Sequence, residues 1–256
     1  MQGARTLCAE LRPSPRSSCA ILPTSPKKMT ASGAFIHQFR DVMPAKKQKW
    51  PQSSAPGSRT KPANSVRIIG GLWRGSKIPL TERTGLRPSA SRTRETLFNW
   101  LQPYISQSRV LDLFAGSGAL GVEALSRGAS HIYFVEPHRE TLNLIEKTVE
   151  RLQLGSRAAG DASFHEQDAV RFLQSHRLPA VDTVLLDPPF DDAQGLIQAI
   201  APSLCQGLQP LHVFLESPIE EYALLNGYFS SAYTAIKQKR IGKSSITLLA
   251  RHDEET

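Results

Sequence analysis

The sequence predicts an α/β protein with a doubly wound, mostly parallel sheet, and three observations support this class. Apolar runs of strand length alternate with helical segments along residues 110–204. A glycine-rich turn joins the first of these strands to the helix that follows it. Acidic residues stand at or near several strand ends, where open α/β sheets bind their ligands. A β-hairpin or extended arm is expected ahead of this domain, near residues 66–80.

The expected elements follow in order along the chain. An amphipathic helix is predicted from Ser91 to about Tyr104, with Ser89 or Ser91 as its N-cap. Its apolar face carries Leu97, Phe98 and Leu101, and another side carries Arg92, Glu95, Thr96 and Asn99. Parallel strands are expected near 110–114, 131–135, 163–167, 181–186 and 211–216. Helices are expected near 119–127, 138–153, 169–176 and 192–204. Strands near 229–236 and 245–250 would end the chain as a hairpin.

The tetrapeptide Asp187-Pro188-Pro189-Phe190 directly follows the apolar run Val181–Leu186. Two prolines prevent both further strand pairing and an immediate helix, so they predict a rigid corner at a strand end. This corner offers a carboxylate, backbone carbonyls and an aromatic ring, which together can hold a planar amine. The alternative is a proline-rich turn in which Phe190 is a core residue.

A second motif lies between the strand at 110–114 and the helix after it. Gly116, Gly118 and Gly121 have the spacing that permits a tight turn and lets a ligand lie against bare backbone. Glu136 ends the next predicted strand, 20 residues beyond Gly116. This offset is typical of a carboxylate that binds the ribose hydroxyls of an adenosine cofactor.

Asp112 distinguishes between two adenosine cofactors. An acid just before the glycine loop repels the pyrophosphate of NAD, and it suits a positively charged cofactor such as S-adenosylmethionine. Its alternative role is that of a structural acid at a strand end. Asp168 follows the strand predicted at 163–167, and its carboxylate could accept a hydrogen bond from an adenine amine. Asp168 could equally be the N-cap of the next helix.

Together these residues resemble the class I S-adenosylmethionine-dependent methyltransferases. The segment Asp112–Gly118 is similar to their first motif, Glu136 to their second acidic position, and Asp187–Phe190 to their amino-methylating motif. Three further segments resemble one subfamily, the RsmD type of bacterial 16S ribosomal RNA guanine-N2 methyltransferase. They are residues 67–75, 85–89 and 92–101. The resemblance covers roughly residues 66–250, with Ser89 where the family often has threonine and a slightly long loop at 155–161.

The resemblance implies a Rossmann-like, seven-stranded, mostly parallel sheet whose last strand is antiparallel, plus the N-terminal β-hairpin. It implies S-adenosylmethionine as cofactor, bound by Asp112, Phe114, Gly116, Gly118, Glu136 and Asp168. It implies catalysis by Asp187, Pro188 and Phe190, and no metal. The expected substrate is the exocyclic N2 of one guanine of 16S ribosomal RNA, within an assembled or nearly assembled 30S subunit.

Other functions stay open from the residues themselves. Adenine-N6 methylation of DNA uses a similar Asp-Pro-Pro motif, and protein-glutamine methylation usually has Asn at the position of Asp187. A NAD-dependent oxidoreductase would leave Asp187 and Asp112 without a role. A ribosome-assembly factor without activity is the non-enzymatic alternative, and the intact acids at 112, 136, 168 and 187 argue against it.

The charge is unevenly distributed. Residues 1–65 hold 11 Lys and Arg against 2 Asp and Glu, residues 66–109 hold 8 against 2, and residues 110–256 hold 12 against 19. The basic surface therefore precedes the sheet, and clustered cations predict contact with phosphates. The candidate RNA-binding residues are Arg67, Arg74, Lys77, Arg87, Arg92 and Arg94, although a solvated charged face is the alternative for each of them singly.

Three segments are expected. Residues 1–65 contain eight of the 18 prolines and many serines, which predicts a disordered basic tail. Translation could begin at Met43, and a targeting peptide over 1–42 is the alternative. Residues 66–90 would form the RNA-binding arm, and 91–252 the catalytic domain.

No apolar stretch reaches the ~18 residues of a membrane span. Three cysteines without a metal or disulfide pattern fit the cytoplasm. A monomer is expected.

Overall fold

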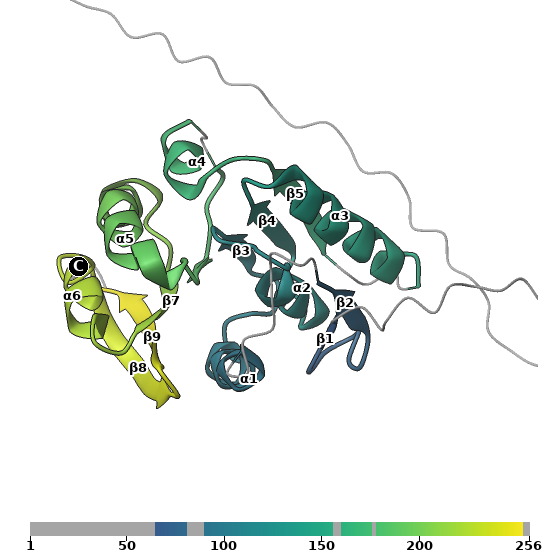
Figure 1. Ribbon diagram of the computed structural model, residues 1–256, viewed down its shortest axis with the longest axis horizontal. Helices are drawn as coiled ribbons and strands as arrows, with labels where there is room; N and C mark the ends of the chain where they lie inside the picture. Colours follow the sequence, from purple (N-terminus) through teal and green to yellow (C-terminus); the bar gives the residue numbers. More distant parts are fainter. Residues whose placement is uncertain (1–64, 81–89, 156–159, 176–177, 253–256) are drawn as a thin grey trace, which may run out of the picture. The chain divides into compact units, whose positions relative to one another are not determined.

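The computed structural model describes residues 65–80, 90–155, 160–175 and 178–252 (Figure 1). All of them belong to one compact unit, Gly57–Thr256. Residues 1–64 of the expected tail lie outside the described residues, as do Arg87 and the possible N-cap Ser89, whereas Ser65 begins a strand.

A seven-stranded sheet forms the centre of this unit, with the strand order β5-β4-β3-β6-β7-β9-β8. The first five strands in this order are parallel, and β9 runs antiparallel to both of its neighbours. Their bounds are β3 Arg109–Asp112, β4 His131–Val135, β5 Asp161–His165, β6 Thr183–Leu186, β7 His212–Pro218, β8 Tyr233–Ile241 and β9 Ser244–Arg251. The predicted mostly parallel sheet with an antiparallel last strand is confirmed.

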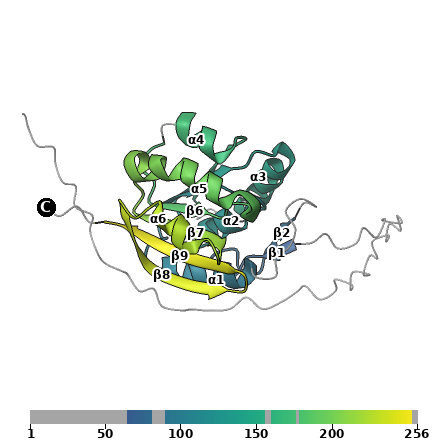
Figure 2. The ribbon, with the colours of Figure 1, turned by 60° about the vertical axis from the view of Figure 1, so that its left-hand side comes forward.

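Helices cover both faces of the sheet (Figures 1 and 2). One face carries α1 (Ala90–Leu101), α2 (Ala119–Ser126) and α3 (Arg139–Gln153). The other carries α4 (Ala169–Ser175), α5 (Ala193–Pro202) and α6 (Tyr222–Gly227). A 3-10 turn, Phe190–Asp192, precedes α5, and a π-helical turn, Ser203–Leu208, follows it. The result is the three-layer arrangement in which both faces of a parallel sheet are shielded from water.

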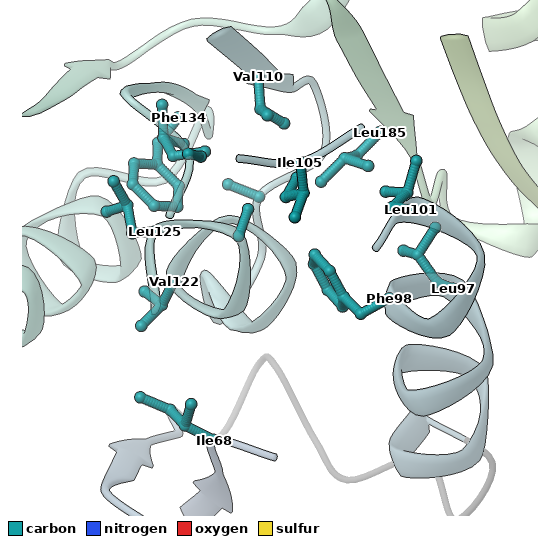
Figure 3. Packing of buried hydrophobic residues seen from close by; sticks show 14 of the residues in the cluster. Ile68, Leu97, Phe98, Leu101, Ile105, Val110, Val122, Leu125, Phe134 and Leu185 are labelled. Atoms are coloured by element: carbon teal, nitrogen blue, oxygen red, sulfur yellow. The ribbon is translucent and has the colours of Figure 1, made fainter. Parts of the chain in front are cut away.

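Two buried clusters fill the spaces between the layers, and residues of the central strands alternate between them. Ile132 and Phe134 of β4 face the cluster beneath α1, α2 and α3, whereas Tyr133 and Val135 face the other cluster. Figure 3 shows how Phe98 of α1, together with Val122 and Leu125 of α2, packs in the first cluster. Burial of each such side chain stabilises the fold by roughly 1.5–3 kcal/mol.

The predicted N-terminal hairpin is present as β1 (Ser65–Arg67) and β2 (Lys77–Pro79), which pair in antiparallel orientation. Ile68, Trp73 and Ile78 from this arm are buried in the first cluster. At Gly71, φ is 77°, and a Cβ there would overlap the carbonyl oxygen of Ser126. Glycine is therefore required for the arm to approach α2 this closely.

Several elements differ from the prediction, among them α1, which ends at Leu101 rather than near Tyr104. The third parallel strand is Asp161–His165, two residues earlier than expected. Strand β8 begins at Tyr233 rather than near 229, because Phe229 turns into the core and the chain reverses at 228–232. Helix α6 was not predicted, since six residues give too little periodicity to recognise.

Candidate cofactor and catalytic site

Three of the predicted acids meet at one edge of the sheet. Asp112 ends β3 and pairs in register with Phe134 of β4 and Leu185 of β6. Glu136 and Asp187 each stand two residues beyond these partners, past the carboxyl ends of their strands. Because parallel strands end at the same edge, the sheet brings the three carboxylates together above its centre.

Asp112 is the most buried of these acids, with only 1% of its surface exposed. Its Oδ2 accepts a hydrogen bond from the Gly121 N–H at 3.0 Å, while its Oδ1 is buried without a hydrogen-bond partner among the described residues. The pKa of Asp112 is raised from 3.8 to about 7, mainly by burial and also by the nearby carboxylates of Asp187 and Glu136, against the backbone hydrogen bonds from Gly121 and Phe114. These carboxylates therefore favour a ligand that brings a hydrogen-bond donor and a positive charge.

The glycine loop lies directly against these acids. Gly118 is the N-cap of α2 with φ at 76°, and its own N–H donates to the carbonyl of Ala115 at 2.7 Å. Gly121 packs so closely on the ring of Phe134 that a Cβ would overlap it. Gly116 donates its N–H to Glu136 Oε2 at 3.0 Å. The loop thus presents side-chain-free backbone beside the ends of two strands.

Glu136 is held in place by its own neighbours. It is 7% exposed, and its Oε1 accepts the His138 N–H at 3.0 Å and lies 2.8 Å from His138 Nδ1. Each carboxylate oxygen has two lone pairs, so Glu136 keeps acceptor capacity for a ligand's hydroxyls beside these bonds.

Asp168 does not end a strand, since β5 stops at His165. Its Oδ1 accepts the Arg171 N–H at 2.9 Å in the first turn of α4, and its Oδ2 pairs with Arg171 Nε at 3.4 Å. The N-cap alternative is therefore confirmed. Asp168 remains partly exposed, and its predicted contact with an adenine amine stays a prediction.

The proline corner has the expected extended form. Residues 187–189 are neither strand nor helix, Pro188 is buried, and Pro189 has φ −55° and ψ 130°. Phe190 then begins the 3-10 turn and stays partly exposed, outside the buried members of both core clusters. This placement disfavours the alternative in which Phe190 is a core residue. Phe114, by contrast, packs against the second cluster while partly exposed.

The candidate RNA-binding residues divide into two groups. Arg67, Arg74 and Lys77 are exposed on the arm, and Arg92 is exposed near the start of α1. Arg94 is only 3% exposed, so its assignment to RNA is corrected. Its Nη2 donates to the Arg67 carbonyl at 2.7 Å, and its Nε lies 3.7 Å from Glu123 Oε2. Arg94 therefore has no surface to offer a phosphate.

Glu123 was not predicted, although it anchors the arm. It is completely buried on α2, and its two oxygens accept the N–H groups of Ile69 at 2.8 Å and Gly70 at 2.7 Å. Arg127 Nε also donates to it at 2.9 Å. One signal in the sequence could have found it, namely a single acid inside the otherwise apolar helix Ala119–Ser126.

Comparisons with known proteins place these features in a family. Residues 66–250 match the family described as Conserved hypothetical protein 95. The ribosomal RNA small subunit methyltransferase D of Haemophilus influenzae is 49% identical over 126 residues, which are 49% of this chain and 64% of that protein. The protein of the same name from Escherichia coli K12 is 43% identical over 136 residues, which are 53% of this chain and 65% of that protein. The matches thus span slightly less than two thirds of these relatives.

The solved structure of the Escherichia coli protein yhhF is 33% identical, with a TM-score of 0.63 over 74% of this chain and 99% of that one. A Haemophilus influenzae structure is 34% identical, with a TM-score of 0.55 over 74% of this chain and all of that one. In the described part of the chain, no helix is both long and apolar enough to cross a membrane. Since the family match covers most of the sequence, the chain belongs to the family described as Conserved hypothetical protein 95.

Proposed function

We propose that this protein transfers a methyl group from S-adenosylmethionine to the exocyclic N2 of a guanine in 16S ribosomal RNA. The observation that carries the proposal is the cluster of Asp112, Glu136 and Asp187 beside a bare glycine loop. The relatives named ribosomal RNA small subunit methyltransferase D support the substrate class.

The carboxylate cluster favours a cationic cofactor over a dinucleotide. A pyrophosphate at this edge would face three acids, whereas the ammonium and sulfonium of S-adenosylmethionine are attracted to them. The open acceptor of Asp112 suits the ammonium, Glu136 suits the ribose hydroxyls, and the backbone at Gly116 leaves room between them. In this proposal Asp168 accepts a hydrogen bond from the adenine amine. When bound, the cofactor supplies an activated methyl group.

The proline corner would position the target amine. Asp187 and the Pro188 carbonyl accept its two hydrogens and so direct the nitrogen lone pair, which is otherwise delocalised into the base, at the methyl carbon. The N–C bond forms as the S–C bond breaks, and Asp187 can take the proton that the methylated amine releases. Phe190 stacks on the base, which must be unpaired or flipped to enter. Most of the catalytic effect is therefore positional.

The arm suits docking on ribosomal RNA. Arg67 and Lys77 are register partners on β1 and β2, so their side chains share the face of the hairpin opposite Val66 and Ile78, which are buried. Arg74 extends this basic surface from the connecting loop. We propose the assembled or nearly assembled 30S subunit as substrate, with a single copy of the protein acting in the cytoplasm.

The test uses labelled S-adenosylmethionine. The purified protein is offered 30S subunits from a strain that lacks the gene, then naked 16S ribosomal RNA, then genomic DNA, and each product is digested to nucleosides. We expect N2-methylguanosine from the subunits. N6-methyladenine from DNA would establish the DNA-modifying alternative, and no transfer despite tight cofactor binding would favour a binding factor.

A further inference from the structure

A polar groove of about 540 Å³ lies between α1 and the hairpin formed by β8 and β9. Helix α1 packs against both of these strands (Figure 2). The residues that line the groove are Arg92, Glu95, Thr96, Asn99, Lys239, Arg240, Ile241 and Gly242. Three are basic and one is acidic, so the groove attracts anions.

One wall of the groove is a polar stripe of α1. Arg92, Glu95, Thr96 and Asn99 follow the helical spacing that places residues on one face. The opposite stripe, with Leu97, Phe98 and Leu101, is fully buried. Core packing thus fixes the rotation of α1 and turns its polar stripe into the groove.

The other wall is the end of β8. Lys239 pairs in register with Ile246, whose side chain belongs to the core cluster beneath α1. Directly opposed side chains lie on the same face of a sheet, so Lys239 points to the α1 side. Ile241, which is 8% exposed, forms the base of this wall. The two-residue turn Gly242–Lys243, with φ of 61° at the glycine, closes the hairpin beyond it.

The groove shares the sheet edge with the proline corner. Ser244 of β9 pairs with Pro218 at the carboxyl end of β7, and Leu186 at the end of β6 pairs with Leu215 of β7. Asp187 and the β8–β9 turn therefore project from the same edge. Three inter-strand steps separate β6 from β8, which is about 14 Å. An RNA strand that delivered a base to Asp187 would pass within a few nucleotides of the groove.

We propose that this groove binds one nucleotide of single-stranded RNA that flanks the target base, with its phosphate between Arg92 and Lys239. The volume is in the range of small-ligand sites, roughly 300–1,000 Å³. Glu95, Thr96 and Asn99 offer hydrogen-bonding groups to the sugar and the base edge. An alternative role for Lys239 is to prevent aggregation, since lysines on an edge strand discourage pairing with other chains. That role does not explain Arg92 or the polar stripe of α1 that faces Lys239. The inference rests on the proposed function, since it names the RNA path to the same site.

The experiment compares the full-length protein with the double variant Arg92→Ala/Lys239→Ala. Both side chains are exposed, so folding should be preserved. We expect KM for 30S subunits to rise about tenfold with kcat within twofold, because the lost contacts are charge-assisted hydrogen bonds to the substrate. The slope of log affinity against log salt should fall by about 0.7, because the contact to one phosphate is lost. Arg109→Ala removes an exposed cation at the opposite edge of the sheet and should leave these values unchanged.

A direct binding assay separates this inference from the proposed function. Fluorescence anisotropy with a labelled single-stranded oligoribonucleotide should show the same loss of affinity in the double variant, whether or not methyl transfer occurs. If the wild-type protein transfers methyl groups but the double variant keeps wild-type KM and anisotropy, the groove assignment is wrong. If no methyl group is transferred at all while RNA binding depends on Arg92 and Lys239, the proposed activity is wrong and the groove remains an RNA site.

Discussion

Replacement of Asp187 should affect turnover and cofactor binding differently. It follows β6 at the corner where the amine would be held, and its carboxylate adds to the raised pKa of Asp112. We expect Asp187→Ala to lower kcat by about 100-fold or more, since a misplaced nucleophile loses its alignment. Cofactor affinity should stay equal or improve, because Asp112 then ionises more readily. Single-turnover methylation and calorimetric titration measure the two quantities. A collapse of cofactor affinity would contradict this assignment.

Asp112 gives the protein a pH dependence whose sign follows from its pKa of about 7. The folded protein holds the proton more tightly than the unfolded chain, so the stability from this group is complete below pH 4 and lost as pH rises through about 7. Binding of a cation needs the ionised form. Affinity for S-adenosylmethionine should therefore rise up to ~10-fold per pH unit below 7 and level off above it.

Calorimetry from pH 6 to 8 measures this profile. Asp112→Asn should bind weakly with a flat profile, whereas Asp187→Ala should shift the midpoint of the rise to lower pH. A wild-type affinity that does not change over this range would show that Asp112 does not face the cofactor's charge.

Helix α2 connects the cofactor loop to the arm. Its beginning is fixed by the hydrogen bond from Gly121 to Asp112, and its later turns hold the arm through Glu123 and Ser126. Ser126 Oγ donates to the Gly70 carbonyl at 2.6 Å and accepts the Trp73 N–H at 2.9 Å. The arm is therefore a fixed part of the core, and its basic residues have a defined position relative to the glycine loop.

Replacement of Glu123 should weaken the attachment of the arm to α2. Glu123→Ala leaves the buried Arg94 guanidinium without its acid and leaves the N–H groups of Ile69 and Gly70 without acceptors. We expect a loss of about 3–5 kcal/mol in the free energy of unfolding. Urea denaturation measures it, with the exposed Arg74→Ala as the matched control on the same arm. The double variant Glu123→Ala/Arg94→Met should recover part of the loss, because the buried charge of Arg94 is then removed and only the partly exposed Arg127 lacks its acid. A single-variant loss below about 1 kcal/mol would contradict the anchoring role.

Local patterns predicted most of the sheet and three of the acids because the evidence for each is contiguous in sequence. An apolar run followed at once by Asp187 or Glu136 already fixes which edge of the sheet the acid occupies. The burial of Arg94 could not be predicted this way, since its partner lies 29 positions away and the arm that covers it docks through contacts across 50 or more residues. The polar stripe of α1 was visible in the sequence, but its opposing wall on β8 was not predicted to be a strand, because Lys239 and Arg240 fall between the strands expected at 229–236 and 245–250. That strand is exposed on both faces from 234 to 240 and lacks alternation.

Basic and acidic residues are concentrated in different segments of the chain, and these segments have different proposed roles. Residues 66–109, which supply the arm and α1, carry 8 basic and 2 acidic side chains, whereas residues 110–256 carry 12 and 19. Asp112, Glu136 and Asp187 of the second segment meet at the cofactor edge, and Arg67, Arg74 and Lys77 of the first segment are exposed on the arm. The cationic cofactor and the polyanionic substrate can then each bind where the electrostatic potential has the opposite sign to their own charge.

The acidic cofactor edge allows the identity of the cofactor to be tested on the intact protein by thermal denaturation. A ligand that binds only the folded state stabilises it by about 2.7 kcal/mol at 100 times its Kd, which corresponds to a rise of about 5–10 °C in Tm for a domain of this size. We expect this shift with S-adenosylmethionine and none with NAD at the same concentration, because three carboxylates meet at the binding edge. Asp112→Asn serves as the control and should lose most of the shift. An equal shift with NAD would mean that the acids do not face the ligand, and the case for a cationic cofactor would fail with it.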